Sequence, residues 1–168
     1  MKLATLEIIF STLNHATVRY LVAGGIAVNI HGYQRMTADL DLVIQLNSDN
    51  LMNALSALAS LGYKPALPVQ AEQFADAKIR QAWIDTKHMQ VFSMISTRYP
   101  DLTIDIFVKE PFDFSQEFDN AVHAEISPTL TIRIVNISTL INMKQIAGRP
   151  RDLDDIEHLR LIQNALHE

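Results

Sequence analysis

The 168-residue sequence contains no cysteine, and this absence excludes two classes of protein. Without cysteine the chain forms no disulfide framework and no thiolate zinc site, which fits the cytoplasmic location that we expect. No apolar run approaches the roughly 20 residues that a membrane-spanning helix needs, so we expect no membrane partner. The N-terminal apolar stretch carries Glu7 and has no small-residue cleavage site, which argues against a signal peptide.

The sequence is also short of positive charge. It has 14 Lys and Arg residues against 19 Asp and Glu residues, and a net charge of −5 gives no general attraction for nucleic acid. A nucleic-acid partner would need a local basic patch, and only the C-terminal third offers one. The composition, 48% hydrophobic, is that of an ordinary folded protein. A chain of this length can bury one core, so we expect a single domain over residues 1–168.

Helical and strand patterns alternate along the chain and predict a mixed β-sheet flanked by helices, an α/β (α+β) architecture. Helices are expected over residues 3–15, 26–31, 48–60, 71–78, 138–146 and 152–166. Strands are expected over residues 19–23, 40–46, 80–85, 89–96, 102–108 and 130–135. The helices from about residue 138 are expected to pack on the core that the earlier elements form.

Two aspartates, Asp39 and Asp41, lie one residue apart in the stretch DLDLVI, which otherwise has the pattern of a buried strand. Because strand side chains alternate between faces, both carboxylates point away from the aliphatic side chains. Asp105 in LTIDIFV has the same parity. If the two strands are neighbours, three carboxylates converge. Burying an unpaired carboxylate is costly, so this pattern predicts a cationic partner.

A hard divalent cation such as Mg²⁺ suits a cluster of carboxylate oxygens and removes the repulsion between them. The alternative is that Asp39 and Asp41 are plain surface acids on a solvated sheet face. The position of Asp105 on a second apolar strand favours the metal site.

Gly24 and Gly25 lie between an expected strand and an expected helix. Glycines at such a junction let backbone N–H groups approach an anion at the positive end of the helix dipole. A tight turn that requires a positive φ is the alternative. The nearby acids favour phosphate binding, because nucleotide phosphates normally arrive with Mg²⁺ attached.

Together these motifs resemble the active-site signature of the nucleotidyltransferase superfamily, whose fold is shared with DNA polymerase beta. The residues that carry the resemblance are Ala23, Gly24, Gly25, Arg35, Thr37, Asp39, Asp41 and Asp105. The stretches HGYQRMT and MKQIAGRPRDLDDIEHL are similar to small prokaryotic members, including abortive-infection toxins of toxin–antitoxin pairs. Many active members have Gly-Ser where this chain has Gly24-Gly25, and toxin-like members commonly carry Gly-Gly.

The resemblance implies a nucleotidyltransferase fold and transfer of NMP from an NTP to an acceptor hydroxyl by a two-metal mechanism. Asp39 and Asp41 would hold two Mg²⁺ ions, with Mn²⁺ as an alternative, and Asp105 would complete one of the two sites. The Gly24 and Gly25 amides would position the triphosphate. The acceptor is a tRNA or other RNA, a protein or a small molecule, and a cognate antitoxin is a further partner that the resemblance implies.

Lys144, Arg149 and Arg151 form the one basic cluster of the sequence. Lys144 is expected to contact nucleotide phosphate, and Arg149 or Arg151 to help hold the triphosphate or the acceptor. The alternative is that these cations pair with local acids such as Asp152.

Arg35 and Thr37 stand just before the acids, and both are assigned to nucleotide binding. A surface ion pair is the alternative for Arg35. Two further functions stay open beside the transferase. One is a catalytically weak nucleotide-binding module or component of a toxin–antitoxin pair, and the other is a metal-dependent phosphoester hydrolase. The presence of all three acids favours the transferase.

Overall fold

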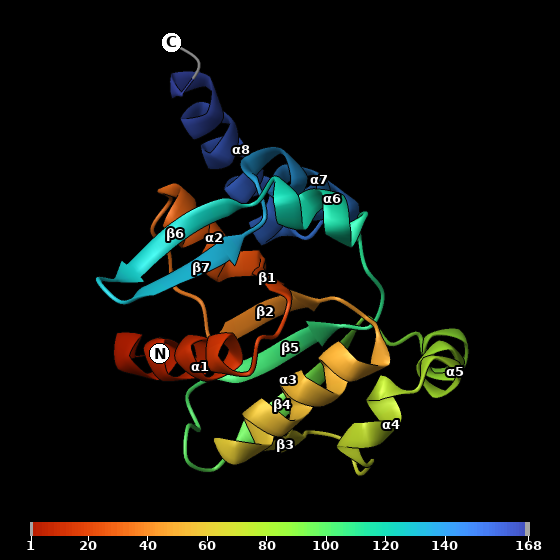
Figure 1. Cartoon of the computed structure of the whole chain (residues 1–168). Coiled ribbons are helices and arrows are strands. Elements are labelled where there is room, and N and C mark those ends of the chain that lie inside the picture. Colours follow the sequence, from red (N-terminus) through yellow and green to blue (C-terminus); the bar gives the residue numbers. More distant parts are fainter. Residues whose placement is uncertain (1, 167–168) are drawn as a thin grey trace.

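The computed structural model describes residues 2–166, which fold around one mixed sheet (Figure 1). Within this range the sheet has seven strands in the order β3-β4-β5-β2-β1-β7-β6. The strands are β1 (Tyr20–Val22), β2 (Asp39–Ile44), β3 (Tyr63–Pro65), β4 (Val91–Ser96), β5 (Thr103–Phe107), β6 (Val122–Ser127) and β7 (Leu130–Ile134). The helices are α1 (Leu3–His15), α2 (Gly24–His31), α3 (Ser48–Ser60), α4 (Ala71–Ala75), α5 (Ala77–Lys87), α6 (Phe114–Asp119), α7 (Ile137–Ala147) and α8 (Pro150–Ala165).

The centre of the sheet is built from β1, β2 and β5. β1 pairs antiparallel with β2, and β2 pairs parallel with β5. On β2 the side chains of Leu40, Leu42 and Ile44 have no exposed surface, and on β5 the same is true of Ile104 and Ile106. The alternation that the sequence shows therefore selects the buried face of both strands.

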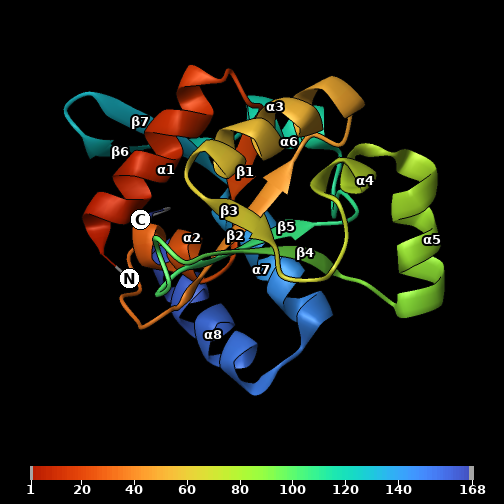
Figure 2. The same cartoon turned by 90° about the horizontal axis from the view of Figure 1, so that it is seen from below.

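Helices cover both faces of this sheet. Figure 2 shows α1 and α3 on one side and α2, α7 and α8 on the other. The buried apolar side chains form one continuous core, in which Ile9, Phe10 and Leu13 of α1 have no exposed surface. The predicted class, a mixed sheet flanked by helices, is confirmed. No helix within residues 2–166 is long and apolar enough to cross a membrane.

The strand predicted over residues 80–85 is wrong, because this segment lies within α5. Asp76 caps that helix by accepting hydrogen bonds from the backbone N–H groups of Lys78 and Ile79. The buried residues of the helix are Arg80 and Trp83, which stand three apart, the spacing of one helical face. The short apolar pattern of the segment does not distinguish a strand from a buried helical face.

Three elements were not expected from the sequence: β3, α6 and β6. The edge strand β6 buries only Ala124, so its sequence lacks a clear apolar alternation. It pairs antiparallel with β7, which the sequence does predict. The short helix α6 begins at Asp113, whose side chain accepts a hydrogen bond from the backbone N–H of Gln116. The strand β6 therefore depends on its pairing with β7, and the helix α6 depends on the cap at Asp113.

Candidate active site

The pairing of β2 with β5 brings two of the predicted carboxylates face to face. Asp41 lies opposite Asp105 in the register of these parallel strands, and Asp39 lies opposite Thr103. Asp41 and Asp105 are half-buried, whereas Asp39 is exposed at the beginning of its strand. The structure thus brings Asp41 and Asp105, which are 64 positions apart in the sequence, to one acidic edge.

The surroundings of Asp41 disfavour its charge. Burial raises the pKa of Asp41 to about 6, and repulsion from Asp105 and Asp39 adds to this effect. Lys144 and Arg149 act in the opposite direction, so both cations lie within electrostatic range of the carboxylate. Their attraction does not cancel the burial and the repulsion.

Asp105 has a fixed hydrogen-bond partner. The hydroxyl of Ser93, on the neighbouring strand β4, donates to Oδ1 of Asp105. Burial raises the pKa of Asp105, the Ser93 hydrogen bond opposes this, and the charge of Asp39 adds to the increase. Among residues 2–166, no hydrogen bond is made to the second oxygen of this carboxylate.

The carboxylates at this edge supply only oxygen donors for a divalent cation. Among residues 2–166, no group of three or more His, Asp or Glu side chains has the arrangement of a metal site. The structure instead contains a facing pair, Asp41 and Asp105, with Asp39 at the open side. The chemistry of these oxygen donors fits Mg²⁺, because positive charge would relieve the repulsion that raises their pKa values.

Gly24 is required by the position of Asp41. A Cβ atom at residue 24 would lie 1.8 Å from Oδ2 of Asp41 and 2.4 Å from its Cγ. The φ of Gly24 is +60°, which also disfavours any residue with a side chain. The backbone that starts α2 therefore passes directly against the carboxylate.

Gly25 is required by a second close approach. A Cβ atom there would lie 2.6 Å from Oγ1 of Thr37 and 3.0 Å from Nη1 of Arg35. The two glycines thus allow the loop before β2 to pack against the first turn of α2. Gly24, Gly25, Arg35, Thr37 and the acids form one contiguous region.

Arg35 is held in place by the last helix. Its Nε and Nη2 donate to the two oxygens of Asp155, at 2.6 and 2.7 Å. Asp155 has no exposed surface, so this pair is buried. The alternative prediction for Arg35 was an ion pair on the surface. Arg35 does form an ion pair in the structure, but this pair is largely buried.

Lys144 is buried among acids. Its Nζ lies 2.6 Å from Asp155 and 3.2 Å from Asp152. The pairing with local acids, given above as the alternative, is therefore the arrangement in the structure. Asp155 was not predicted as a site residue. It lies four residues before the buried Leu159, so both side chains share one helical face, and this spacing could have indicated that Asp155 is buried.

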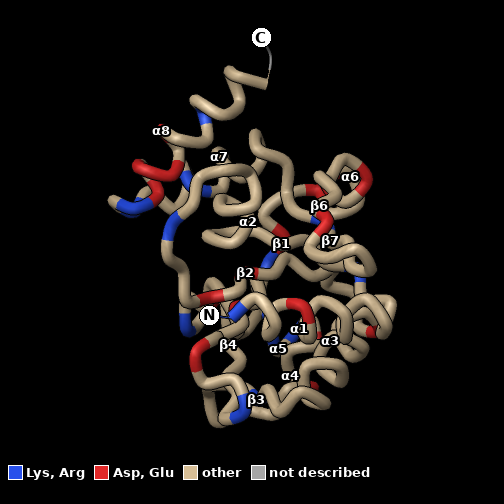
Figure 3. The backbone as a smooth tube through the Cα atoms, turned by 90° about the vertical axis from the view of Figure 1, so that its left-hand side faces the viewer, with Lys and Arg blue, Asp and Glu red and all other residues tan. Residues whose placement is uncertain are grey.

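Arg149 differs from Lys144 because its side chain is 75% exposed. Its Nε donates to Asp152 at 2.7 Å, and Asp152 also accepts from the Arg149 backbone N–H at the start of α8. Arg151 is exposed. Figure 3 shows basic and acidic residues side by side at the beginning of α8. Arg149 thus carries its charge at the surface, within electrostatic range of Asp41.

Comparisons with solved structures show the same fold in antibiotic-modifying enzymes. A solution structure of the antibiotic-resistance factor ANT(2'')-Ia has a TM-score of 0.59 and 15% sequence identity, covering 98% of this chain and 83% of that one. A lincomycin-bound crystal structure of the lincosamide antibiotic adenylyltransferase LnuA has a TM-score of 0.59 and 16% identity, covering 95% and 96%. A crystal structure of ANT(2")-Ia with adenylyl-2"-tobramycin has a TM-score of 0.57 and 12% identity, covering 98% and 96%.

Sequence comparison gives the family. No curated protein matches the sequence significantly. A family model described as "Nucleotidyl transferase AbiEii toxin, Type IV TA system" matches residues 10–165, which include every site residue discussed above. The resemblance to abortive-infection nucleotidyltransferases that the sequence motifs indicated is confirmed. The chain therefore belongs to the AbiEii family of nucleotidyltransferases.

Proposed function

We propose that the chain transfers a nucleoside monophosphate from an NTP to an acceptor hydroxyl at the edge formed by β2 and β5. An acceptor oxygen forms a bond to the α-phosphorus, and the bond to the leaving pyrophosphate breaks. One observation carries this proposal: Asp41 and Asp105 face each other against the Gly24 backbone, and burial together with the charge of neighbouring acids raises both pKa values. Divalent cations that bind beside such a pair would relieve the repulsion between its carboxylates.

The acids would hold the metal. Asp39, Asp41 and Asp105 are the residues that we assign to Mg²⁺ or Mn²⁺, and two ions are expected from the family. A bound ion supplies neutralisation of phosphate charge and a lower pKa for the acceptor hydroxyl. Asp105 is oriented by the Ser93 hydroxyl, so its remaining oxygen is fixed for accepting the proton of the acceptor.

The first turn of α2 would receive the triphosphate. This helix begins at Gly24, and the N–H groups of a first turn have no partners within the helix. Arg149 has an exposed side chain, and we assign it a contact with phosphate. Lys144, Arg35 and Thr37 are assigned to the same nucleotide site. In the structure Lys144 and Arg35 are fixed by Asp155, so they contribute positive charge from constant positions.

The partner proposal comes from the family. Its description names a type IV toxin–antitoxin system, and we propose a cognate antitoxin as the protein partner of this chain. The acceptor is a hydroxyl of an RNA, a protein or a small molecule. The adenylyltransferase LnuA, a structural neighbour, was solved with an antibiotic, which keeps small molecules among the acceptors to be tested.

The proposal is tested by measuring transfer of labelled nucleoside monophosphate to an acceptor. The purified protein is incubated with Mg²⁺, each α-labelled NTP in turn, and separate pools of total tRNA, protein and small molecules. We expect label in one pool and equal release of pyrophosphate. Asp41→Asn and Asp105→Asn are each expected to lower the rate at least about 100-fold. Asp101→Asn, an exposed acid just before β5, is the matched control and should keep full activity.

The other outcomes identify the alternatives. Saturable NTP binding with no pyrophosphate release in any pool would make the chain a nucleotide-binding module. Cleavage of a phosphoester without incorporation of label would make it a hydrolase. Full activity of Asp105→Asn would remove this residue from the mechanism.

A further inference from the structure

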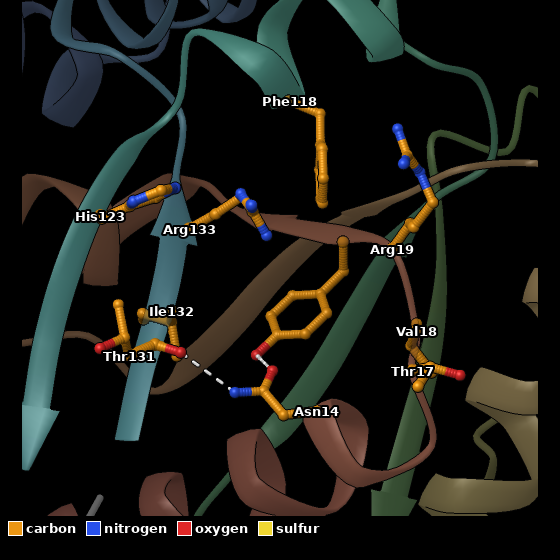
Figure 4. Close-up of a pocket in the computed structure, with 10 residues that line it drawn as sticks. Asn14, Thr17, Val18, Arg19, Phe118, His123, Thr131, Ile132 and Arg133 are labelled. Carbon is orange, nitrogen blue, oxygen red and sulfur yellow. Dashed lines mark hydrogen bonds between the residues drawn. The ribbon is translucent and has the colours of Figure 1, made fainter. Parts of the chain in front are cut away.

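A second polar cavity lies at the opposite end of β1 from the acids. Arg19 immediately precedes β1 and Gly24 follows it, so about 16 Å of extended chain separates the two positions. The cavity has a volume of about 420 Å³, and it is enclosed by α1, β1, α6 and the β6–β7 hairpin (Figure 4). The lining residues on which the argument depends are Asn14, Arg19, Tyr20, Phe118, His123 and Arg133.

Two arginines stack on one aromatic ring in this cavity. The Cζ atoms of Arg19 and Arg133 each lie 4.2 Å from the centroid of Phe118. Figure 4 shows the two guanidinium groups on either side of the ring. Their Cζ atoms are therefore separated by no more than twice 4.2 Å. Arginine stays charged at any physiological pH, so two full positive charges are held close together.

Neither guanidinium has an anionic partner. The Nε atoms of both arginines are buried without a hydrogen-bond partner, and neither side chain forms an ion pair with any residue from 2 to 166. No carboxylate lines the cavity. Arg35, in contrast, donates its Nε to a buried carboxylate. Buried polar groups are normally satisfied, so two unpaired donors of the same kind in one cavity favour an anionic ligand.

The rest of the lining combines the apolar side chains of Val18 and Ile132 with polar groups that are hydrogen-bonded to one another. The hydroxyl of Tyr20 donates to Oδ1 of Asn14, and Nδ2 of Asn14 donates to the backbone carbonyl of Thr131. His123, on the edge strand β6, also lines the cavity. The cavity thus combines two permanent cations and a histidine with neutral polar groups, and its volume falls in the range of sites for small ligands.

We propose that this cavity, the Arg19–Arg133 cavity, binds a phosphate-bearing ligand. The planar guanidinium fork matches the oxygens of phosphate, and the two forks are kept apart by the Phe118 ring. Two separated forks suit a ligand with more than one anionic group, which is a property of a polyphosphate and of a nucleic-acid strand. A free nucleotide and an RNA backbone are the two sources of this chemistry. The proposal does not depend on the proposed function.

The test observes the two Nε–H groups directly. Amide and side-chain ¹H–¹⁵N spectra of the full chain are recorded in an Asp41→Asn background, while pyrophosphate, ATP and a short single-stranded RNA are added in turn at constant ionic strength. The Nε–H signals of Arg19 and Arg133 should shift with saturation, and that of Arg35 should stay unchanged. Saturation by ATP identifies a nucleotide site, and saturation by RNA alone identifies a strand-binding site.

Variants separate a binding site from a structural stack. Arg19→Gln with Arg133→Gln should weaken the binding of the preferred probe at least tenfold. Arg98→Gln is the matched control, because Arg98 also stacks on an aromatic ring, that of Tyr99, but is far along the chain from the cavity residues. Circular dichroism checks that each variant is folded. If the double variant does not fold, the signals of the two arginines in the parent chain decide alone.

Three results would overturn the proposal. The first is that no probe moves the Arg19 and Arg133 signals. The second is that chloride moves them as far as phosphate does. The third is that an acidic peptide saturates them while every phosphate probe fails, since the cavity would then bind a carboxylate. Transfer activity at the β2–β5 edge is measured separately, so failure of either proposal is recognised independently.

Discussion

The two groups of aspartates in this molecule are in opposite electrostatic states. On β2 and β5, burial raises the pKa of Asp41 to about 6 and raises that of Asp105 as well, and the charge of neighbouring acids adds to both increases. At the start of α8, burial acts on Asp152 and Asp155 too, but hydrogen bonds from arginine and lysine outweigh it and hold both pKa values below the usual range.

The difference is one of partners. Asp155 is in contact with both Arg35 and Lys144, so its charge is neutralised within the chain. Asp41 faces the carboxylate of Asp105 across the strand pair, and no ion pair among residues 2–166 includes it. A buried acid with its own cations is part of the framework, whereas a buried acid next to like charge depends on something from outside. This contrast supports the proposal that the β2–β5 edge is the functional one.

The largest effect on stability is expected from removing the carboxylate of Asp155, which is paired with two cations. Asp155→Ala leaves Arg35 and Lys144 without their shared buried anion, and should lower the free energy of unfolding by about 3–5 kcal/mol. Chemical denaturation measures this loss. Glu157→Ala, an exposed acid two residues later on α8, is the control and should change stability by less than about 0.5 kcal/mol. Equal effects of the two substitutions would contradict the assignment.

The next effect concerns the contact between Asp41 and Gly24. Gly24→Ala should lower the free energy of unfolding by about 2–3 kcal/mol and abolish transfer, because the new Cβ would displace the carboxylate. Gly148→Ala measures backbone strain alone. Its φ of +62° is nearly the same, but its nearest neighbour is 3.7 Å away, so a loss of about 1 kcal/mol is expected. A similar loss of stability at both positions would show that the close approach of residue 24 to Asp41 does not affect the free energy of unfolding.

A smaller effect should appear in the pH dependence of stability. The folded pKa of Asp41 is raised from 3.8 to about 6, so the protonated form is favoured by folding. Its contribution is fully present below the unfolded pKa and is lost as the pH rises from 3.8 to about 6. The wild type should therefore lose about 1–2 kcal/mol relative to Asp41→Asn over this window, because solvent screening of the half-buried carboxylate reduces the roughly 3 kcal/mol that the full pKa change implies. Parallel stability curves for the two proteins would show that the carboxylate is not destabilised by its surroundings.

The smallest expected effect is stabilisation by a divalent cation. Mg²⁺ or Mn²⁺ at ten times its dissociation constant should raise the free energy of unfolding by about 1.4 kcal/mol at neutral pH. The effect should disappear in Asp41→Asn and should be weaker at pH 5, where the acid is protonated. Thermal unfolding with and without EDTA measures it. An equal increase in the variant would place the cation elsewhere.

Much of the fold follows from alternation in the sequence. The patterns DLDLVI and LTIDIFV correctly predict two central strands and the face that each presents, and the register then places Asp41 opposite Asp105. Alternation depends on only one strand at a time, so it succeeds where each strand buries its own aliphatic side chains. It fails at β6, where only Ala124 is buried, and over residues 80–85, where a helix buries Arg80 and Trp83.

Side-chain partners were harder to predict than strands. The sequence places Lys144 near phosphate, but the structure surrounds its Nζ with Asp152 and Asp155. The pairing of Arg35 with Asp155 spans 120 residues, and no local pattern contains such a contact. The Arg19–Phe118–Arg133 stack likewise joins three separate elements. Contacts of this kind depend on the whole topology.

The long reach of the Arg35–Asp155 pair has a consequence for how the protein is made. During synthesis the two halves of this pair leave the ribosome far apart in time, and the arginine beside the acids waits without its anion until α8 has emerged. A nascent chain in which β1, β2 and β5 have already joined still lacks this connection. The buried pair that holds Arg35 can therefore form only after α8 has been synthesised.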